Sequence, residues 1–272
     1  MKYGLGLRPL HYQAIVDTRP DVDFFEALSE DFMHFVGTDI DYLEKIRALY
    51  PIVLHGVSLS IGSTDPLNQA YLASLKKLID RFNPLWISDH FCWTGVNHIN
   101  THDLLPLPLT HETVTHVASR VNQVQDILQQ PILLENISSY ITFKQSEMTE
   151  WEFINAVTER TNCFVLLDVN NIYVNAFNHG FNAKDYLHGI KKETVKQFHL
   201  SGHQHCDTHI IDTHDANIAT DVWNLYRDAE RLFSNTPLVI ERDANVPPLQ
   251  ELLKELRHTQ KLNISKSALM RA

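Results

Sequence analysis

Short apolar segments alternate with amphipathic segments along almost the whole chain. Each apolar segment has five or six residues rich in β-branched, aliphatic and aromatic types, a pattern typical of buried strands. Several follow a proline, as in YPIVLHG and TPLVIERD, where the missing N–H is not needed for strand pairing. The pattern predicts eight strands: Tyr3–Leu7, Val22–Ala27, Ile52–Val57, Leu85–His90, Ile132–Asn136, Phe164–Asp168, Val195–Leu200 and Leu238–Arg242.

The segments between these strands carry apolar residues at helical spacing. PLNQAYLASLKKLIDRF places such residues on one face from Leu67 to Phe82, and HETVTHVASRVNQVQDILQ does the same from Val114 to Leu128. MTEWEFINAVTERT contains Thr149 three residues before Glu152, the spacing of a capping box. DVWNLYRDAERLF and PPLQELLKELRH predict the last two helices.

Repeated strand–helix units with nearly continuous apolar strands indicate a parallel sheet. Eight units in a chain of this length predict an α/β fold of the (β/α)₈ TIM-barrel type. A doubly wound open sheet is the alternative, because periodicity does not reveal whether the sheet closes. No linker-like segment divides the chain, so we expect one barrel domain over residues 1–260 and a flexible C-terminal tail over 261–272.

Composition narrows the classes of function. Hydrophobic residues make up 44% of the 272 residues, enough for a sizeable core, and the formal net charge of −10 disfavours binding to nucleic acid or an anionic membrane. The cysteines Cys92, Cys163 and Cys206 form no CxxC motif, which argues against a disulfide framework. Because the sequence has neither a signal-peptide core nor a membrane-spanning run, we expect a cytoplasmic protein.

Polar side chains mark the carboxyl ends of six successive predicted strands. They are His55, His90, Glu135, Asp168, His199 and Glu241. In a parallel barrel these ends meet at one face, where the chemistry of such folds is found. A single strand-end histidine or glutamate is more often structural, but six in succession favour a site with several metal ions.

The types of side chain restrict the metal. Imidazole and carboxylate suit zinc, iron or manganese, and no thiolate is required. Three histidines and three carboxylates exceed the needs of one ion, so at least one carboxylate is expected to bridge two ions. Glu135 is the candidate bridge, because its strand lies in the middle of the six.

The order of these six residues resembles that of the trinuclear ligands of endonuclease IV-like and xylose isomerase-like barrels. In that pattern Asp-x-His follows the seventh-strand histidine, and here Asp212 and His214 follow His199. The resemblance therefore implies that Asp212 and His214 are also ligands. Those enzymes carry a histidine three residues after the sixth-strand aspartate, whereas this chain has Asn171, with Asn170 as an equal candidate for the ligating amide.

Longer motifs resemble one branch, the multinuclear non-heme iron-dependent oxidative enzymes (MNIO). The resemblance extends from Tyr3 to about Leu253. It is carried by GLGLRPLHY, DFFEALSEDFM, LHGVSLSIGSTDPL, SDHFCW, LLPLPLT, LLENISSY, LLDVNNIYVNAFNHGF, HLSGH, IDTH and IERDANVPPL. It implies an oxidoreductase with two or three iron ions in a mixed-valence cluster, which uses O₂ to modify cysteine residues of a ribosomally synthesised precursor peptide. It also implies a small partner protein that presents the peptide.

Within that resemblance each candidate residue has an expected role. The expected ligands are His55, His90 and Glu135 for one ion; Glu135, Asp168, His199 and Glu241 for a second; and Asn171, Asp212 and His214 for a third. Asp243 and His203 are expected to transfer protons or to orient ligands. Arg8 and Glu26 are expected to bind the peptide, with an ion pair between them as the alternative. Asp89 is a candidate for fixing the tautomer of His90, with a surface salt bridge as the alternative.

Two other functions remain open from the sequence. A zinc-dependent phosphodiesterase acting on abasic DNA would use the same barrel and ligand order, but Asn171 and the acidic charge count against it. A barrel that binds metal without turnover is the other alternative.

Overall fold

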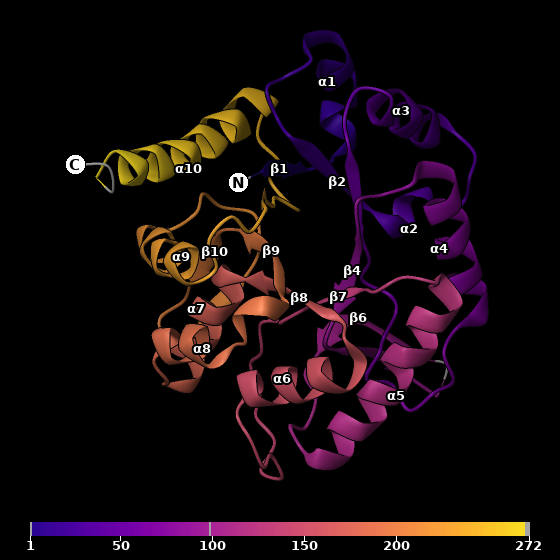
Figure 1. Ribbon diagram of the computed structural model, residues 1–272, viewed down its shortest axis with the longest axis vertical. Coiled ribbons are helices and arrows are strands. Elements are labelled where there is room, and N and C mark those ends of the chain that lie inside the picture. Colours follow the sequence, from indigo (N-terminus) through magenta and orange to yellow (C-terminus); the bar gives the residue numbers. More distant parts are fainter. Residues whose placement is uncertain (1, 98, 270–272) are drawn as a thin grey trace.

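The computed structural model describes residues 2–97 and 99–269 of the chain. Eight parallel strands form one closed barrel in the order β1-β12-β9-β8-β7-β4-β3-β2 (Figure 1). The strands are β1 Tyr3–Gly6, β2 Phe24–Leu28, β3 Ile52–His55, β4 Ile87–His90, β7 Leu133–Glu135, β8 Phe164–Asp168, β9 Val195–Leu200 and β12 Leu238–Ile240. The predicted barrel is therefore confirmed, and the open sheet is excluded because β1 pairs with both β2 and β12.

Helices surround the barrel and connect its strands. They are α1 Tyr12–Thr18, α2 Ser29–Phe32, α3 Thr38–Arg47, α4 Gln69–Phe82, α5 His111–Leu128, α6 Glu150–Thr161, α7 Val169–His179, α8 Ala183–Gly189, α9 Thr220–Leu232 and α10 Leu249–Leu269, with 3₁₀ turns η1 Pro9–His11 and η2 Lys192–Thr194. The predicted capping box begins α6: the backbone N–H of Thr149 donates to Glu152 Oε2 at 2.8 Å, and the Glu152 N–H donates to Thr149 Oγ1.

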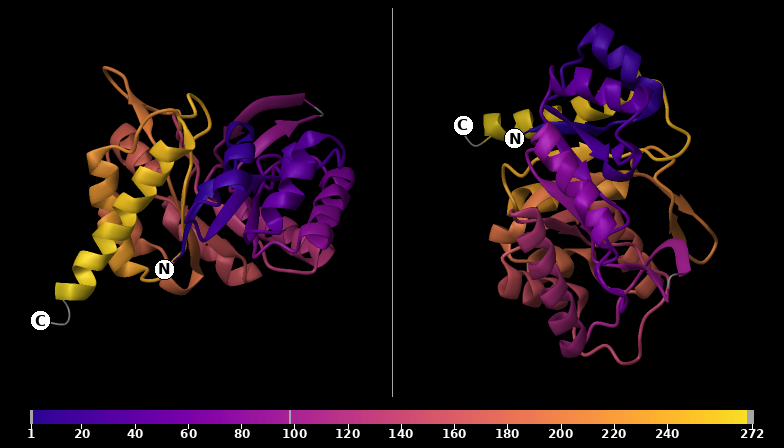
Figure 2. Two further views of the ribbon diagram at one scale, coloured as in Figure 1. Left: turned by 90° about the horizontal axis from the view of Figure 1, so that it is seen from above. Right: turned by 90° about the vertical axis from the view of Figure 1, so that its right-hand side faces the viewer.

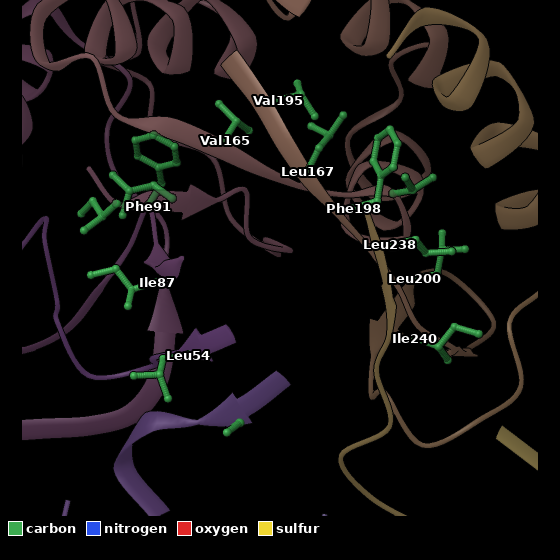
Figure 3. Packing of buried hydrophobic residues seen from close by; sticks show 14 of the residues in the cluster. Leu54, Ile87, Phe91, Val165, Leu167, Val195, Phe198, Leu200, Leu238 and Ile240 are labelled. Carbon is green, nitrogen blue, oxygen red and sulfur yellow. The ribbon is translucent and has the colours of Figure 1, made fainter. Parts of the chain in front are cut away.

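Alternating strand residues face two different environments. Residues such as Leu54, Leu167 and Leu238 belong to the main hydrophobic core, to which the surrounding helices also contribute (Figure 3). A smaller cluster joins Phe24, Val53 and Val239, which come from β2, β3 and β12. Because β3 and β12 are not neighbours in the sheet, these three side chains must meet inside the barrel. This small cluster closes the amino-terminal part of the barrel interior.

Two hairpins that the apolar pattern did not predict stand outside the barrel sheet. β5 (Trp93–Val96) pairs with β6 (Ile99–Leu105), and β10 (His203–His205) pairs with β11 (Ile210–Asp212). In the left view of Figure 2 both hairpins rise on the side opposite the N-terminus. That is the side to which the parallel strands point, so the hairpins flank the carboxyl-terminal mouth of the barrel.

Three remaining features concern the whole chain. Within residues 2–97 and 99–269, no helix has the length and apolarity that crossing a membrane requires. The three cysteines are free, with Cys92 and Cys163 buried. The backbone of α10 continues to Leu269, whereas 270–272 of the predicted tail lie outside the described residues; the flexibility of 261–272 stays a prediction.

Candidate metal centre

The six predicted strand-end residues meet at the mouth of the barrel. Glu241 lies two residues after Val239, and His55 lies two residues after Val53, so both side chains point inward like the small interior cluster below them. All six side chains are buried. Strand side chains point alternately into and out of the barrel. Inside the barrel, the strand-end side chains therefore form a polar layer on top of the small apolar cluster.

Glu135 lies at the centre of this polar layer and is only 1% exposed. Its Oε2 atom is 3.4 Å from His55 Nε2 and 3.2 Å from His90 Nε2. Its Oε1 atom is 3.2 Å from His199 Nδ1. One carboxylate therefore faces three imidazoles from three strands, the geometry that a bridging ligand needs.

Three groups of candidate ligand atoms converge within the described residues. In each group one atom per side chain lies within 4.8 Å of the others. The groups are His55, Glu135 and His199; Glu135, Asp168, His199 and Glu241; and His214, Glu241 and Asp243. The first two share Glu135 and His199, and the last two share Glu241. The first group contains His199 where His90 was expected, and the four members of the second group are those expected from the sequence for the second ion.

The third group differs from the expected set of Asn171, Asp212 and His214. Asp212 Oδ1 does lie 2.8 Å from His214 Nε2, but the convergent group around His214 contains Glu241 and Asp243 instead. His214 Nδ1 is 3.3 Å from Glu241 Oε2 and 3.2 Å from Asp243 Oδ2. Asp243, expected only to transfer protons or orient ligands, thus lies where a ligand could.

The two neighbouring asparagines have different surroundings. Asn171 Nδ2 donates to the Asn136 carbonyl at 3.0 Å, while its Oδ1 atom has no hydrogen-bond partner. The residue lines the cavity that opens at the mouth of the barrel, called here the central cavity. Asn170 Nδ2 donates to Asp212 Oδ1 at 2.8 Å, and its Oδ1 lies 2.7 Å from His203 Nδ1. The free oxygen favours Asn171 over Asn170 as the ligating amide.

In His55 and His90, the ring nitrogen that does not face Glu135 makes a second contact. His55 Nδ1 lies 2.8 Å from Ser88 Oγ, and His90 Nδ1 lies 3.0 Å from the Gly56 carbonyl. Asp89 is farther from His90 Nδ1, at 3.8 Å, and accepts from the Leu59 N–H instead. The Gly56 carbonyl, not Asp89, is therefore placed to fix the tautomer of His90.

His199 is held by Glu26 and Gln197. Its Nε2 atom lies 2.8 Å from Glu26 Oε1 and 2.9 Å from Gln197 Nε2. Gln197 Nε2 also donates to Glu26 Oε2, and Trp86 Nε1 donates to Gln197 Oε1. Gln197 was not among the residues predicted for the site, although its position two residues before His199 on the same strand indicates an inward side chain.

The carboxylates and imidazoles shift one another's pKa values. Burial acts to raise the pKa of Glu135, but His199 and His90 outweigh it and lower that pKa below its usual range. Burial acts to lower the pKa of His90, but the carboxylates of Glu135 and Asp89 together outweigh it and raise that pKa to about 10. Burial, reinforced by Glu135, raises the pKa of Asp168 well above its usual value. Protons thus balance the clustered negative charge, as bound cations would.

The donor set fits divalent metal ions. Glu135 Oε2, Asp168 Oδ2 and Asn171 Oδ1 are buried oxygens without a hydrogen-bond partner. Buried oxygens left in this way are costly unless an ion or water satisfies them. Nitrogen and oxygen donors without thiolate suit iron, zinc or manganese, and one carboxylate between three imidazoles suits more than one ion.

A cavity of about 610 Å³ opens over the polar layer. His55, His90, Glu135 and Glu241 form its floor, and Asp103 and Tyr140 belong to its wall. It is large enough for a short peptide segment or a small molecule.

The other predicted site residues divide between this cavity and its surroundings. Arg8 lies on the wall and forms an ion pair with Asp243. Glu26 is not on the wall; its contact with His199 favours an orienting role over the predicted contact with a peptide. His203 is also off the wall, stacked on Tyr173 with ring centroids 5.3 Å apart.

Several solved structures have a similar fold. A D-tagatose 3-epimerase-like protein has a TM-score of 0.63 at 12% identity, over 99% of this chain and 100% of the other. The 3-keto-D-glucoside 4-epimerase YcjR from E. coli has a TM-score of 0.60 at 14% identity, over 95% of this chain and 99% of the other. At these identities the likeness concerns the fold alone.

Sequence relatives are closer. A UPF0276 protein of Caulobacter vibrioides (strain NA1000 / CB15N) is 48% identical over 255 residues, covering 93% of this chain and 91% of the relative. A UPF0276 protein of Psychromonas ingrahamii is 39% identical over 269 residues, covering 97% and 94%. The family model described as RiPP precursor modification enzyme MbnB/TglH/ChrH matches residues 2–263. The chain therefore belongs to this family of enzymes that modify the precursors of ribosomally synthesised and post-translationally modified peptides.

Proposed function

We propose that this protein is an iron-dependent oxidase that uses O₂ to modify cysteine residues of a ribosomally synthesised precursor peptide. The observation that carries the proposal is the buried Glu135 carboxylate, which faces His55, His90 and His199 at 3.2–3.4 Å. An arrangement of this kind suits two ions that share one carboxylate. Membership of a peptide-modifying family supplies the class of substrate.

The family resemblance and the convergent groups together suggest a distribution of ligands. His55, His90 and Glu135 would hold one ion, with His90 included because its Nε2 lies 3.2 Å from Glu135 Oε2. Glu135, Asp168, His199 and Glu241 would hold a second. The candidate ligands for a third ion are His214, Asp212, which lies 2.8 Å from it, and the convergent pair Glu241 and Asp243. Asn171 offers its free amide oxygen as a further ligand. Glu26 would hold His199 in orientation through Nε2.

Bound iron would supply redox chemistry between a cysteine thiolate and O₂. The chain's own residues would prepare that chemistry. The cavity over the ligands admits a peptide segment, and Arg8 on its wall offers a cation to the peptide backbone. Asp243 pairs with Arg8 and lies 3.2 Å from His214, so it could accept a proton near the cavity mouth. A small partner protein that presents the peptide is proposed from the family resemblance alone.

The test uses protein purified without oxygen and loaded with ferrous iron. Oxygen uptake and peptide mass are measured with a short cysteine-containing peptide encoded beside the gene, and with its Cys→Ser version. We expect a mass change and oxygen uptake only with the cysteine peptide and only in the iron-loaded protein. Binding of zinc alone, with cleavage of abasic DNA, would instead support the phosphodiesterase; stable iron without uptake would support a metal store.

A further inference from the structure

A second cavity, of about 310 Å³, lies beside the one over the candidate metal centre. Pro106, Ile137, Ser139 and Ile141 line both cavities, so one thin partition separates them. The second cavity, called here the side cavity, extends from this partition to the start of α6 and the end of α7. A peptide that places one residue in the central cavity would therefore have a neighbouring residue close to the side cavity.

The lining of the side cavity is mainly apolar. Phe91, Leu109, Met148, Phe153 and Phe181 contribute aromatic and aliphatic surface. Among the described residues that line it, there is no lysine or arginine. Such a surface stabilises an uncharged side chain by removing it from water, and it penalises a charged one.

Hydrogen bonds fix the partition between the cavities. Asn175 Nδ2 donates to the Ile137 carbonyl at 2.8 Å, and Asn175 Oδ1 accepts from the Ser139 N–H at 2.7 Å. His179 Nε2 lies 2.9 Å from the Ser139 carbonyl. Because three contacts hold this loop to α7, the side cavity is preformed, which reduces the ordering cost of binding.

One acidic group lies in this apolar surrounding. Glu150 lines the side cavity, and its Oε2 accepts from Asn175 Nδ2 at 3.4 Å. Burial raises the pKa of Glu150 to about 7, so a large part of this carboxyl is protonated near neutral pH. A protonated carboxyl can both donate to and accept from the polar end of a side chain such as tyrosine.

We infer that the side cavity is a specificity subsite for an uncharged aromatic or aliphatic side chain of the substrate peptide, close in sequence to the residue that enters the central cavity. The inference rests on the proposed function for the identity of the ligand as a peptide. Its physical basis is the shared partition, the apolar lining and the volume.

The test requires neither iron nor oxygen, so its outcome is independent of whether the protein is an oxidase. Metal-free protein is titrated near pH 6.5 with N-acetyl-tyrosinamide, N-acetyl-leucinamide and N-acetyl-lysinamide, and binding is followed by ligand-observed NMR. We expect the tyrosine and leucine amides to bind and the lysine amide to bind at least about tenfold more weakly.

Variants at the rim of the side cavity test whether the amides bind there. Thr142→Trp introduces an indole at an exposed position of the side-cavity rim and should weaken binding at least about tenfold. Ser234→Trp is the matched control, because Ser234 is exposed on a different cavity near the starts of β9 and β12. Ser146→Trp is a second filling variant should Thr142→Trp not fold. Equal binding of the lysine amide, unchanged binding in a folded filling variant, or no binding to the wild type would overturn the inference.

Discussion

At the scale of single residues, Glu135 is the side chain expected to matter most for metal binding. Glu135→Gln removes an anionic ligand that faces three imidazoles, and an amide cannot bridge two cations as a carboxylate does. We expect this variant to lose more than one ion per chain and all activity. His214→Ala should lose mainly one outer ion and keep part of the activity. Metal analysis after anaerobic iron loading makes the comparison, and equal losses in the two variants would remove the bridging role.

Glu26 gives a second prediction about single residues. Its Oε1 atom lies 2.8 Å from His199 Nε2, on the side away from the candidate ligand atom Nδ1. Replacing it by glutamine removes the charge that orients the imidazole and should weaken metal affinity by about tenfold or more. Glu44→Gln, in an exposed pair with Arg81, is the control. Chelator competition measures the affinity for ferrous iron. An unchanged affinity in Glu26→Gln would contradict the orienting role of Glu26.

Glu150 predicts a dependence of stability on pH. Its folded-state pKa of about 7 is higher than its ordinary value, mainly because of burial, although Asn175 and Tyr186 oppose the shift. The folded state therefore binds the proton more tightly, and stability from this group is present at low pH and falls as pH rises from about 4.5 to 7. Glu150→Gln should raise the free energy of unfolding by about 1–3 kcal/mol at pH 8 and change it little at pH 4.5. Urea unfolding at both pH values measures this change in the free energy of unfolding. An equal change at pH 4.5 and pH 8 would show that the ionisation of Glu150 does not affect stability.

At the scale of secondary-structure elements, helix caps contribute separately from the metal centre. Thr110 precedes α5, and its Oγ1 accepts from the Thr113 N–H at 3.1 Å. Thr110→Ala should lower the free energy of unfolding by about 1 kcal/mol, because it leaves a helix N–H without that partner. Ser119→Ala, at an exposed position within the same helix, should change it by no more than about 0.5 kcal/mol. Denaturant unfolding of the metal-free protein compares the two variants. Equal changes in the free energy of unfolding would show that the Thr110 cap does not stabilise the protein.

The barrel strands were predictable because their signal is local. An apolar run such as Phe164–Asp168 identifies a buried strand without knowledge of its neighbours, and the observed β8 has the same bounds. The hairpin strand β6 gives no such signal, because Ile99–Asp103 are exposed and mixed in character. The two hairpins around the mouth therefore had to come from the structure.

The position of the candidate site at the mouth of the barrel was predictable from the sequence, but its atomic contacts were not. His55 and Glu241 end apolar strands, so their common position at the mouth followed from barrel geometry. Which atoms converge depends on packing across the barrel, which no local pattern contains. The contact of Glu26 with His199, between β2 and β9, is of this kind. The surroundings of His214 likewise depend on how the segment after β11 lies against Asp243.

At the scale of the whole molecule, bound metal should stabilise the barrel. The candidate ligands come from the ends of five barrel strands and from the segments that follow β9 and β12, and ions held by the folded chain shift the unfolding equilibrium toward it. Ferrous iron in large excess over its dissociation constant should raise the melting temperature by about 5–10 °C under anaerobic conditions. Differential scanning fluorimetry measures the shift. The same shift in Glu135→Gln would mean that iron binds elsewhere.

We propose that the mouth of the barrel holds iron ions joined through Glu135. Mössbauer spectroscopy of protein reconstituted anaerobically with ⁵⁷Fe and then partly oxidised tests it most directly. We expect magnetically coupled ferrous and ferric ions in the wild type and loss of that coupling in Glu135→Gln. Uncoupled, isolated iron in the wild type, or coupling that persists in Glu135→Gln, would contradict it.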